Sequence, residues 1–189
     1  MGNNLKKGSS ENKIRYLNHN EFENLLNIQK NLRDELIISL LYEIGCTVNE
    51  LVNIKNKNFD FDQNLLKIQG KSARNKEQRY VYLSDKIISS IKKFQKANLN
   101  SDFLFFSRQS PTMTTKRIRQ IVQKYLKTIG IEKAGPQILR YTHIVHAYQK
   151  KIPLDAIQKQ VGLKRSRAIE IFGQLPELNT KNPYKKFTE

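Results

Sequence analysis

The sequence contains a single cysteine, Cys46, and no tryptophan. One cysteine excludes an intramolecular disulfide and a cysteine-rich zinc site. With three histidines and no cysteine pair, we expect neither a structural metal nor any other cofactor. Long apolar runs are missing as well, because the longest, residues 36–41, is far too short to cross a bilayer. The polar N-terminus (MGNNLKKGSSENK) lacks the apolar core of a signal peptide, so the sequence predicts a soluble cytoplasmic protein without a membrane partner.

Acidic residues are scarce relative to basic ones. The chain has 17 Asp and Glu against 34 Lys and Arg, which gives a net charge of +17 and a pI near 9.9. Residues 101–189 hold 17 of the basic and 6 of the acidic side chains, a net charge of +11. A folded domain with such a positive half typically binds a polyanion, above all a nucleic acid. The alternative is a merely solvated basic surface produced by Lys- and Asn-rich coding.

The pattern of apolar residues predicts one mainly helical domain with a small antiparallel β-hairpin or sheet. The domain spans residues 15–175, between a flexible arm (1–14) and a polar tail (176–189) that carries Tyr184 and Phe187 as candidate anchors. Alternating polarity predicts strands over residues 64–70 and 78–83. Helices are expected over residues 18–26, 32–44, 48–54, 85–94, 114–129, 138–150, 154–161 and 164–173. The polar segment between the strands predicts a hairpin tip region that carries Lys71, Arg74, Lys76 and Arg79.

Four ordered stretches resemble the tyrosine recombinase (phage integrase) family over residues of about 15–175. YEIGCTVNELVNI at 42–54 resembles the first box, which usually has Gly, an apolar residue, Arg, two variable residues and Glu-Leu. QGKSARNKEQRYVYLS at 69–84 is similar to the lysine hairpin. GPQILRYTHIVHAYQKKIPLDAIQKQVGLKR at 135–165 is similar to the second box, normally His-x-x-Arg and later Leu-Gly-His. SRAIEIFGQL at 166–175 lies where the family has its nucleophilic tyrosine.

The resemblance implies a site in which two of six family positions are retained. Lys71 and Arg140 match the hairpin lysine and the second arginine. The other four positions hold different residues. Thr47 stands at the position of the first arginine, Gln137 and Leu163 at the two histidine positions, and Phe172 at the position of the nucleophile.

Phe172 decides the chemistry that we expect. In the family, a tyrosine oxygen attacks the scissile phosphate, arginines stabilise the charge that develops, and a lysine protonates the departing oxygen. Phenylalanine has no oxygen, Leu163 cannot donate a hydrogen bond, and Thr47 offers no cationic fork. The resemblance therefore implies a DNA-binding protein that does not cut DNA in the family's usual way.

Other residues could in principle restore the chemistry. Tyr141, Tyr148 or the tail residue Tyr184 are candidate displaced nucleophiles, and tails of this family often reach a neighbouring subunit. The competing interpretation of Tyr141 and Tyr148 is packing within a helix. His143 and His146 could replace the missing histidines through a shifted register, or be partly buried polar residues.

The retained and basic residues indicate a duplex DNA partner. Lys71 and Arg140 would bind phosphate, with the amide of Gln137 beside the guanidinium. The alternative for Arg140 is a structural ion pair with Glu50 or another acid. Further DNA-binding candidates lie in the predicted hairpin, in the predicted helix over 114–129 and around the end of the second box. They are Arg74, Lys76, Lys116, Arg117, Arg119, Lys164, Arg165 and Arg167.

Three functions remain open at this point. The first is an inactive recombinase-like DNA-binding protein with an accessory, regulatory or architectural role in a prokaryote or its mobile element, associated with the nucleoid. The second is an active recombinase or integrase that uses another tyrosine, such as Tyr184. The third is a protein-interaction module. For the partners, the tail is expected to be the segment that could contact a second copy of the chain or a recombinase. RNA is the alternative to DNA as the nucleic acid.

Overall fold

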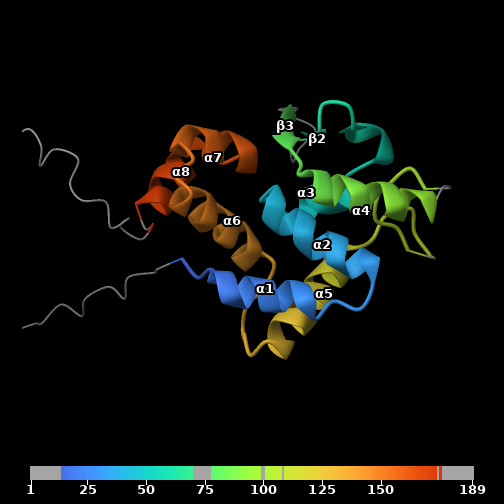
Figure 1. The fold of residues 1–189 in the computed structure, drawn as a ribbon, viewed down its shortest axis with the longest axis horizontal. Helices are drawn as coiled ribbons and strands as arrows, with labels where there is room; N and C mark the ends of the chain where they lie inside the picture. The colour runs from blue at the N-terminus through green and yellow to red at the C-terminus, as the bar shows by residue number, and fades with distance from the viewer. Residues whose placement is uncertain (1–13, 70–77, 99–100, 108, 174, 176–189) are drawn as a thin grey trace, which may run out of the picture.

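The computed structural model describes residues 14–69, 78–98, 101–107, 109–173 and 175. Helices dominate, and the main elements follow one another as in Figure 1. The helices are α1 (His19–Asn27), α2 (Leu32–Glu43), α3 (Val48–Val52), the short 3-10 helix η1 (Asn56–Asn58), α4 (Asp85–Lys96), α5 (Thr115–Thr128), α6 (Gln137–Gln149), α7 (Leu154–Val161) and α8 (Arg165–Phe172).

The strands form an antiparallel sheet in the order β1 (Phe59–Asp60), β2 (Leu65–Gln69) and β3 (Gln78–Tyr82). Leu66 and Val81, which are register partners, face the core, whereas Tyr80 and Tyr82 on the other face are 59% and 72% exposed. This alternation is the sheet pattern that the sequence predicted. The first strand was not predicted, because two residues are too few to show a period.

Helix α2 lies at the centre of the main core. It contacts α1, α3, α4, α5 and α6, and its residues Ile37, Ile38, Leu40 and Leu41 are completely buried. A helix that is apolar on nearly all sides is stable only when other elements surround it. Gly45, with φ +57°, ends the turn after α2, which places the first box directly beside the centre of the domain.

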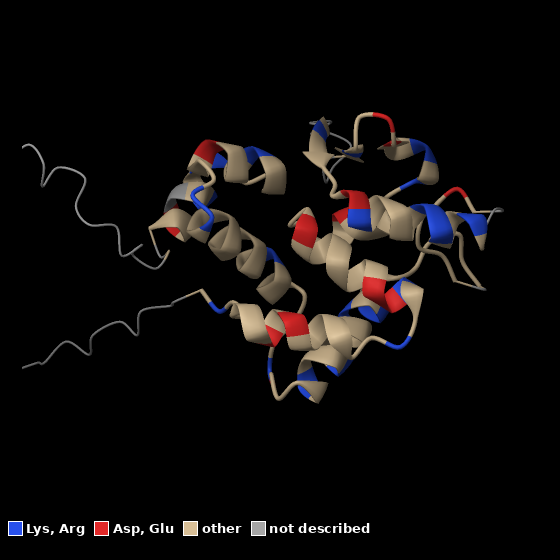
Figure 2. Ribbon diagram, viewed as in Figure 1, with Lys and Arg blue, Asp and Glu red and all other residues tan. Residues whose placement is uncertain are grey.

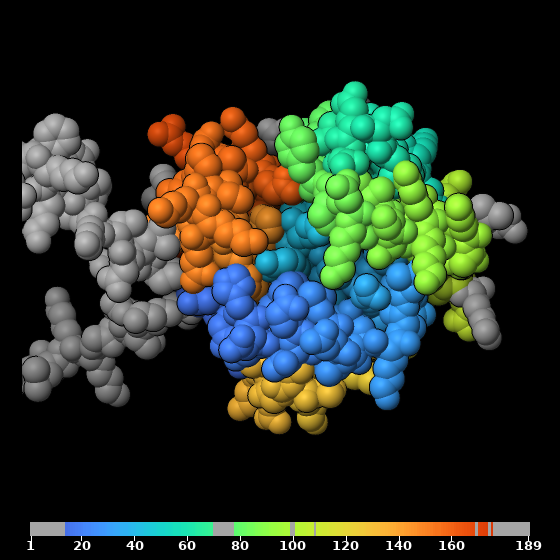
Figure 3. Space-filling model, viewed as in Figure 1, coloured from blue at the N-terminus to red at the C-terminus, as the bar shows by residue number. Residues whose placement is uncertain are grey.

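The three C-terminal helices build a second, smaller cluster from Ile144, Ala147, Ile157, Val161 and Ile171. In the space-filling view, α6 and α7 gather on one side of the face and the strands with α4 on the other (Figure 3). Both Ile14 and Leu175, the ends of the described chain, pack against this cluster. The nucleophile position thus belongs to a helix that is held by its own small core.

The segment before α1 is fixed to α6. The Leu17 N–H donates to Thr142 Oγ1 at 2.9 Å, and His146 Nε2 lies 3.0 Å from the Leu17 carbonyl oxygen. The side chain of Leu17 is fully buried. Asn18 then caps α1 in a capping box with Glu21.

The predicted fold class is confirmed: the domain is mainly α with a small antiparallel sheet. Most helices begin and end within two residues of their predicted limits; α4 is two residues longer than expected and α3 two residues shorter. The predicted tip residues Lys71, Arg74 and Lys76, and the tail with Tyr184, lie outside the described residues. Within the described part of the chain, no helix is both long enough and apolar enough to cross a membrane.

Candidate functional site

Arg140 lies at the junction of three elements. It belongs to α6, is 5% exposed, and donates through Nη1 to the carbonyl oxygens of Gly45 (2.5 Å) and Val161 (2.7 Å). Burial lowers its pKa and the charge of Glu50 opposes that shift, but an arginine stays protonated at any ordinary pH. The retained arginine therefore joins α6 to the turn after α2 and to the C-terminus of α7.

The alternative for Arg140, an ion pair with Glu50, is not found in the structure. Glu50 Oε1 instead accepts a hydrogen bond from Arg79 Nη1 at 2.6 Å, and both side chains are largely buried. Arg79 Nε donates to the Gln160 carbonyl oxygen at 3.0 Å. The placement of Arg79 in the hairpin tip region was therefore wrong: it lies on β3 and points inward with Val81, because residues two apart share one face of a strand.

Thr47 binds the same carboxylate, that of Glu50. Its backbone N–H and its hydroxyl donate to Glu50 Oε2 at 2.7 and 2.9 Å, and the pair forms a capping box at the start of α3. Burial opposes ionisation of Glu50, but the bond and charge of Arg79 and the bonds from Thr47 outweigh it, so the pKa of Glu50 is lowered. The position that would hold the first arginine thus contributes a helix cap instead.

Phe172 and Leu163, at the nucleophile and later histidine positions, both pack against the apolar C-terminal cluster. Phe172 is the last residue of α8 and is half-buried, whereas Leu163 follows the left-handed Gly162 that ends α7. Neither side chain carries a group that can exchange a proton or attack phosphorus. Both replacements thus place an apolar side chain where the family has a polar group.

Two of the candidate displaced tyrosines lie in the same cluster. The hydroxyl of Tyr141 accepts a hydrogen bond from Arg167 Nη2 at 3.1 Å, and Arg167 also pairs with Glu170. Tyr148 is partly buried against the cluster. The hydroxyl of Tyr141 thus lies beside an arginine, although its ring packs against the C-terminal cluster.

His143 and His146 lie on the side of α6 that faces the N-terminal helices. His146 bonds the Tyr42 hydroxyl through Nδ1 at 3.0 Å and stacks on His19. Burial lowers the pKa of each histidine to about 4, with a further contribution from Arg140 at His143 and from His19 at His146. Both are therefore neutral at pH 7, and their contacts favour the packing interpretation.

The remaining DNA-binding candidates are exposed. On α5, whose residues include no acid, Lys116, Arg117 and Arg119 all face solvent, and the parts of this helix that are visible in Figure 2 include blue segments. Lys164, just before α8, and Arg165, the first residue of α8, are also exposed. Gln137 is exposed at the start of α6, and no hydrogen bond between described residues joins it to Arg140.

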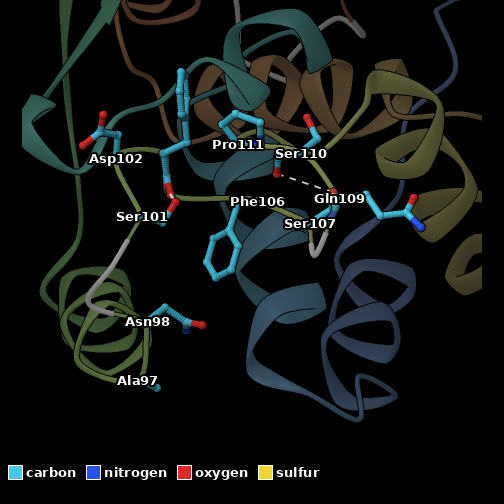
Figure 4. A pocket seen from close by; sticks show the side chains of 10 residues that line it. Ala97, Asn98, Ser101, Asp102, Phe106, Ser107, Gln109, Ser110 and Pro111 are labelled. Carbon is cyan, nitrogen blue, oxygen red and sulfur yellow. Dashed lines mark hydrogen bonds between the residues drawn. The ribbon is translucent and has the colours of Figure 1, made fainter.

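A pocket lies elsewhere, between the end of α4 and the segment before α5 (Figure 4). It has a volume of about 780 Å³ and no basic residue among its described lining residues, so it does not suit a phosphate. Its walls are Ala97, Asn98, Ser101, Asp102, Phe103, Phe106, Ser107, Gln109, Ser110 and Pro111. Among the residues with described positions, no three His, Cys, Asp or Glu side chains are grouped so that they could hold a metal ion.

The fold and the arrangement of the two boxes define the catalytic domain of a tyrosine recombinase. The chain belongs to the phage integrase family, whose model matches residues 15–175. It is 31% identical over 141 residues to the tyrosine recombinase XerC of Thermodesulfovibrio yellowstonii, covering 69% of this chain and 46% of that protein. The chain thus spans about half the length of this relative.

Two solved structures show the same fold. The XerA recombinase matches with a TM-score of 0.78 and 21% identity, covering 94% of this chain and 66% of that chain. The XerH site-specific recombinase, bound to its difH substrate in a pre-cleavage complex, matches with a TM-score of 0.74 and 24% identity, covering 85% and 50%.

Proposed function

We propose that this chain binds duplex DNA as a recombinase catalytic domain does, and that it does not cleave the strand. The observation that carries the proposal is the pair of apolar side chains, Phe172 and Leu163, at the nucleophile and histidine positions, while Arg140 is retained. Without an attacking oxygen, the phosphotyrosyl intermediate cannot form at this position.

Binding to DNA is supported by charge and by family. The chain carries a net charge of +17, and the exposed basic residues of α5 meet no acid on their own helix. The XerH neighbour is bound to its DNA substrate. Contacts to phosphates by Lys and Arg supply much of the affinity of such proteins and make it fall steeply with salt. Lys71, Arg74, Lys76, Lys164 and Arg165 complete the proposed phosphate-binding set.

The biological role that fits these properties is accessory or regulatory. A protein that occupies a recombination site without cutting it would modulate an active recombinase, in the cytoplasm and at the nucleoid of a prokaryote. The tail, residues 176–189, is the segment through which we propose that it joins a second copy or a recombinase partner.

A displaced nucleophile defines the second candidate function, an active site-specific recombinase in DNA recombination or integration. The observation in its favour is the hydrogen bond between Tyr141 and Arg167, because a guanidinium stabilises a phenolate. Tyr184 is the tail residue that would serve the same purpose. The third candidate, a protein-interaction module, is favoured by the exposed aromatic side chains of Tyr80 and Tyr82.

A duplex-binding measurement tests the proposed function. Fluorescence anisotropy with labelled DNA at low and moderate salt should show binding that weakens as salt rises. Arg117→Ala with Arg119→Ala should lower affinity at all sequences and make the salt dependence shallower, by about one unit of slope for each lost phosphate contact. Lys159→Ala, which removes one charge at an exposed position of α7, is the control. Absence of binding at low micromolar protein would favour the interaction module.

A further inference from the structure

We infer that Arg79 is a positioning residue for DNA binding, because it holds Glu50 and thereby leaves the positive charge of Arg140 to a DNA phosphate. The inference rests on the proposed function and names a residue for which the family resemblance supplies no role. It concerns three charged side chains at one place: two guanidinium groups and a single carboxylate. Which guanidinium the carboxylate neutralises decides how positive the phosphate-binding position is.

Every oxygen of this carboxylate has a partner other than Arg140. Oε1 of Glu50 binds Arg79 Nη1, while Oε2 accepts from the backbone and the hydroxyl of Thr47. Arg140 donates instead to two carbonyl oxygens, which carry no net charge. Among the described residues it forms no salt bridge, so no acid there pairs with it directly.

The three groups are nonetheless close enough to influence one another. The charge of Glu50 raises the pKa of Arg140 and that of Arg79 lowers it, after burial as the larger cause. The thiol of Cys46 is subject to all three charges. If Arg79 were removed, the buried carboxylate would still have the guanidinium of Arg140 within electrostatic range, and a buried charge is stable only when it is paired.

Arg79 itself is poorly placed to contact DNA. Its side chain is 17% exposed, Nε is bound to the Gln160 carbonyl oxygen, and Nη2 is buried without a hydrogen-bond partner among the described residues. The guanidinium also lies over Gly162, where a Cβ would be 2.7 Å from Nη1. These contacts fix Arg79 between β3 and α7, facing Glu50 rather than solvent.

A four-variant cycle on the full chain tests the inference, with duplex DNA affinity and urea unfolding measured for each protein. Arg79→Met should weaken DNA binding about tenfold, because Glu50 then pairs with Arg140. Glu50→Gln alone should leave affinity unchanged or raise it. The double variant Arg79→Met/Glu50→Gln should recover wild-type affinity, whereas a direct DNA contact by Arg79 would not be recovered.

A matched ion pair separates this effect from net charge. Lys159→Met and Lys159→Met/Asp155→Asn change the net charge by the same amounts at an exposed pair, and should alter affinity by less than about twofold. A double variant at Arg79 and Glu50 that binds as weakly as Arg79→Met contradicts the inference. If Arg79→Met does not fold, Glu50→Gln decides, since weaker binding by that variant also contradicts it. Wild-type protein that fails to bind DNA contradicts the proposed function itself.

Discussion

The guanidinium of Arg140 donates a hydrogen bond to the carbonyl oxygen of Val161, 21 residues further along the chain, at a distance of 2.7 Å. Val161 is the last residue of α7, where carbonyl oxygens lack partners within the helix and carry partial negative charge. The preceding carbonyl oxygen, of Gln160, is bound by Arg79. Two arginines thus hold the C-terminus of α7, so the site's retained cation also stabilises the fold.

Arg140→Met should lower the free energy of unfolding by about 3 kcal/mol, because two buried carbonyl oxygens lose their donor. Urea unfolding followed by circular dichroism measures the change. Arg165→Met, at an exposed position, is the control and should stay within about 0.5 kcal/mol of wild type. Equal stabilities for the two variants would contradict the structural role of Arg140.

Gly162→Ala should destabilise the protein by about 2–4 kcal/mol. The backbone has φ +67° and the added Cβ would lie 2.7–3.0 Å from three atoms of the Arg79 guanidinium, so conformational strain and displacement of an ion pair act together. Gly130→Ala separates the two causes, since Gly130 also has positive φ (+80°) but nothing within 4 Å of the added atom. That control should cost only about 1 kcal/mol. The same cost for both would contradict the contact with Arg79.

Stability should fall as the pH decreases from about 6.5 to 4, the window between the ordinary pKa of histidine and the lowered values of His143 and His146. In this window the unfolded chain binds protons that the folded chain does not, which favours unfolding. The loss is at most about 3 kcal/mol for each histidine. Urea unfolding at pH 7.5 and pH 5 measures it. His146→Gln should reduce the difference between the two pH values; an unchanged difference would exclude His146 as a source.

Phe172→Tyr should not by itself restore strand cleavage. Leu163 would still supply no hydrogen-bond donor at the later histidine position, and Thr47 would still supply no cation. Each missing donor costs a few kcal/mol of barrier in such reactions, on the order of 2.7–4 for one oxyanion-type contact. A nicked-duplex cleavage assay at long incubation measures the product. Rapid cutting by this single variant would show that the remaining site is more complete than its described residues indicate.

The sequence predicted the helices well because their signals are local. The cap that Asn18 and Glu21 form at the start of α1 and the acid-free amphipathic pattern of α5 each involve residues that are close together in the sequence. The contacts that build the site are not local. Arg79 bonds Glu50, 29 residues away in the sequence, and Gln160, 81 residues away. A periodic pattern cannot predict which residues pair at such separations.

One signal for Arg79 was nevertheless present. In the strand QRYVYL, Arg79 alternates in step with Val81 and Leu83, both buried, so its side chain had to face the core side of the sheet. A basic residue on that face requires an acid, and Glu50 of the first box is the buried acid that the structure supplies. The two-residue period of this strand therefore places Arg79 on its core-facing side and not in the hairpin tip.

The most direct test of the account is a suicide-substrate assay on the wild-type chain. Incubation with nicked duplex DNA, followed by SDS gel electrophoresis, detects any covalent protein–DNA adduct. We expect DNA binding without an adduct, because Phe172 supplies no oxygen for attack on phosphorus. An SDS-stable adduct would contradict the account, and its loss in Tyr141→Phe or Tyr184→Phe would identify the tyrosine that forms it.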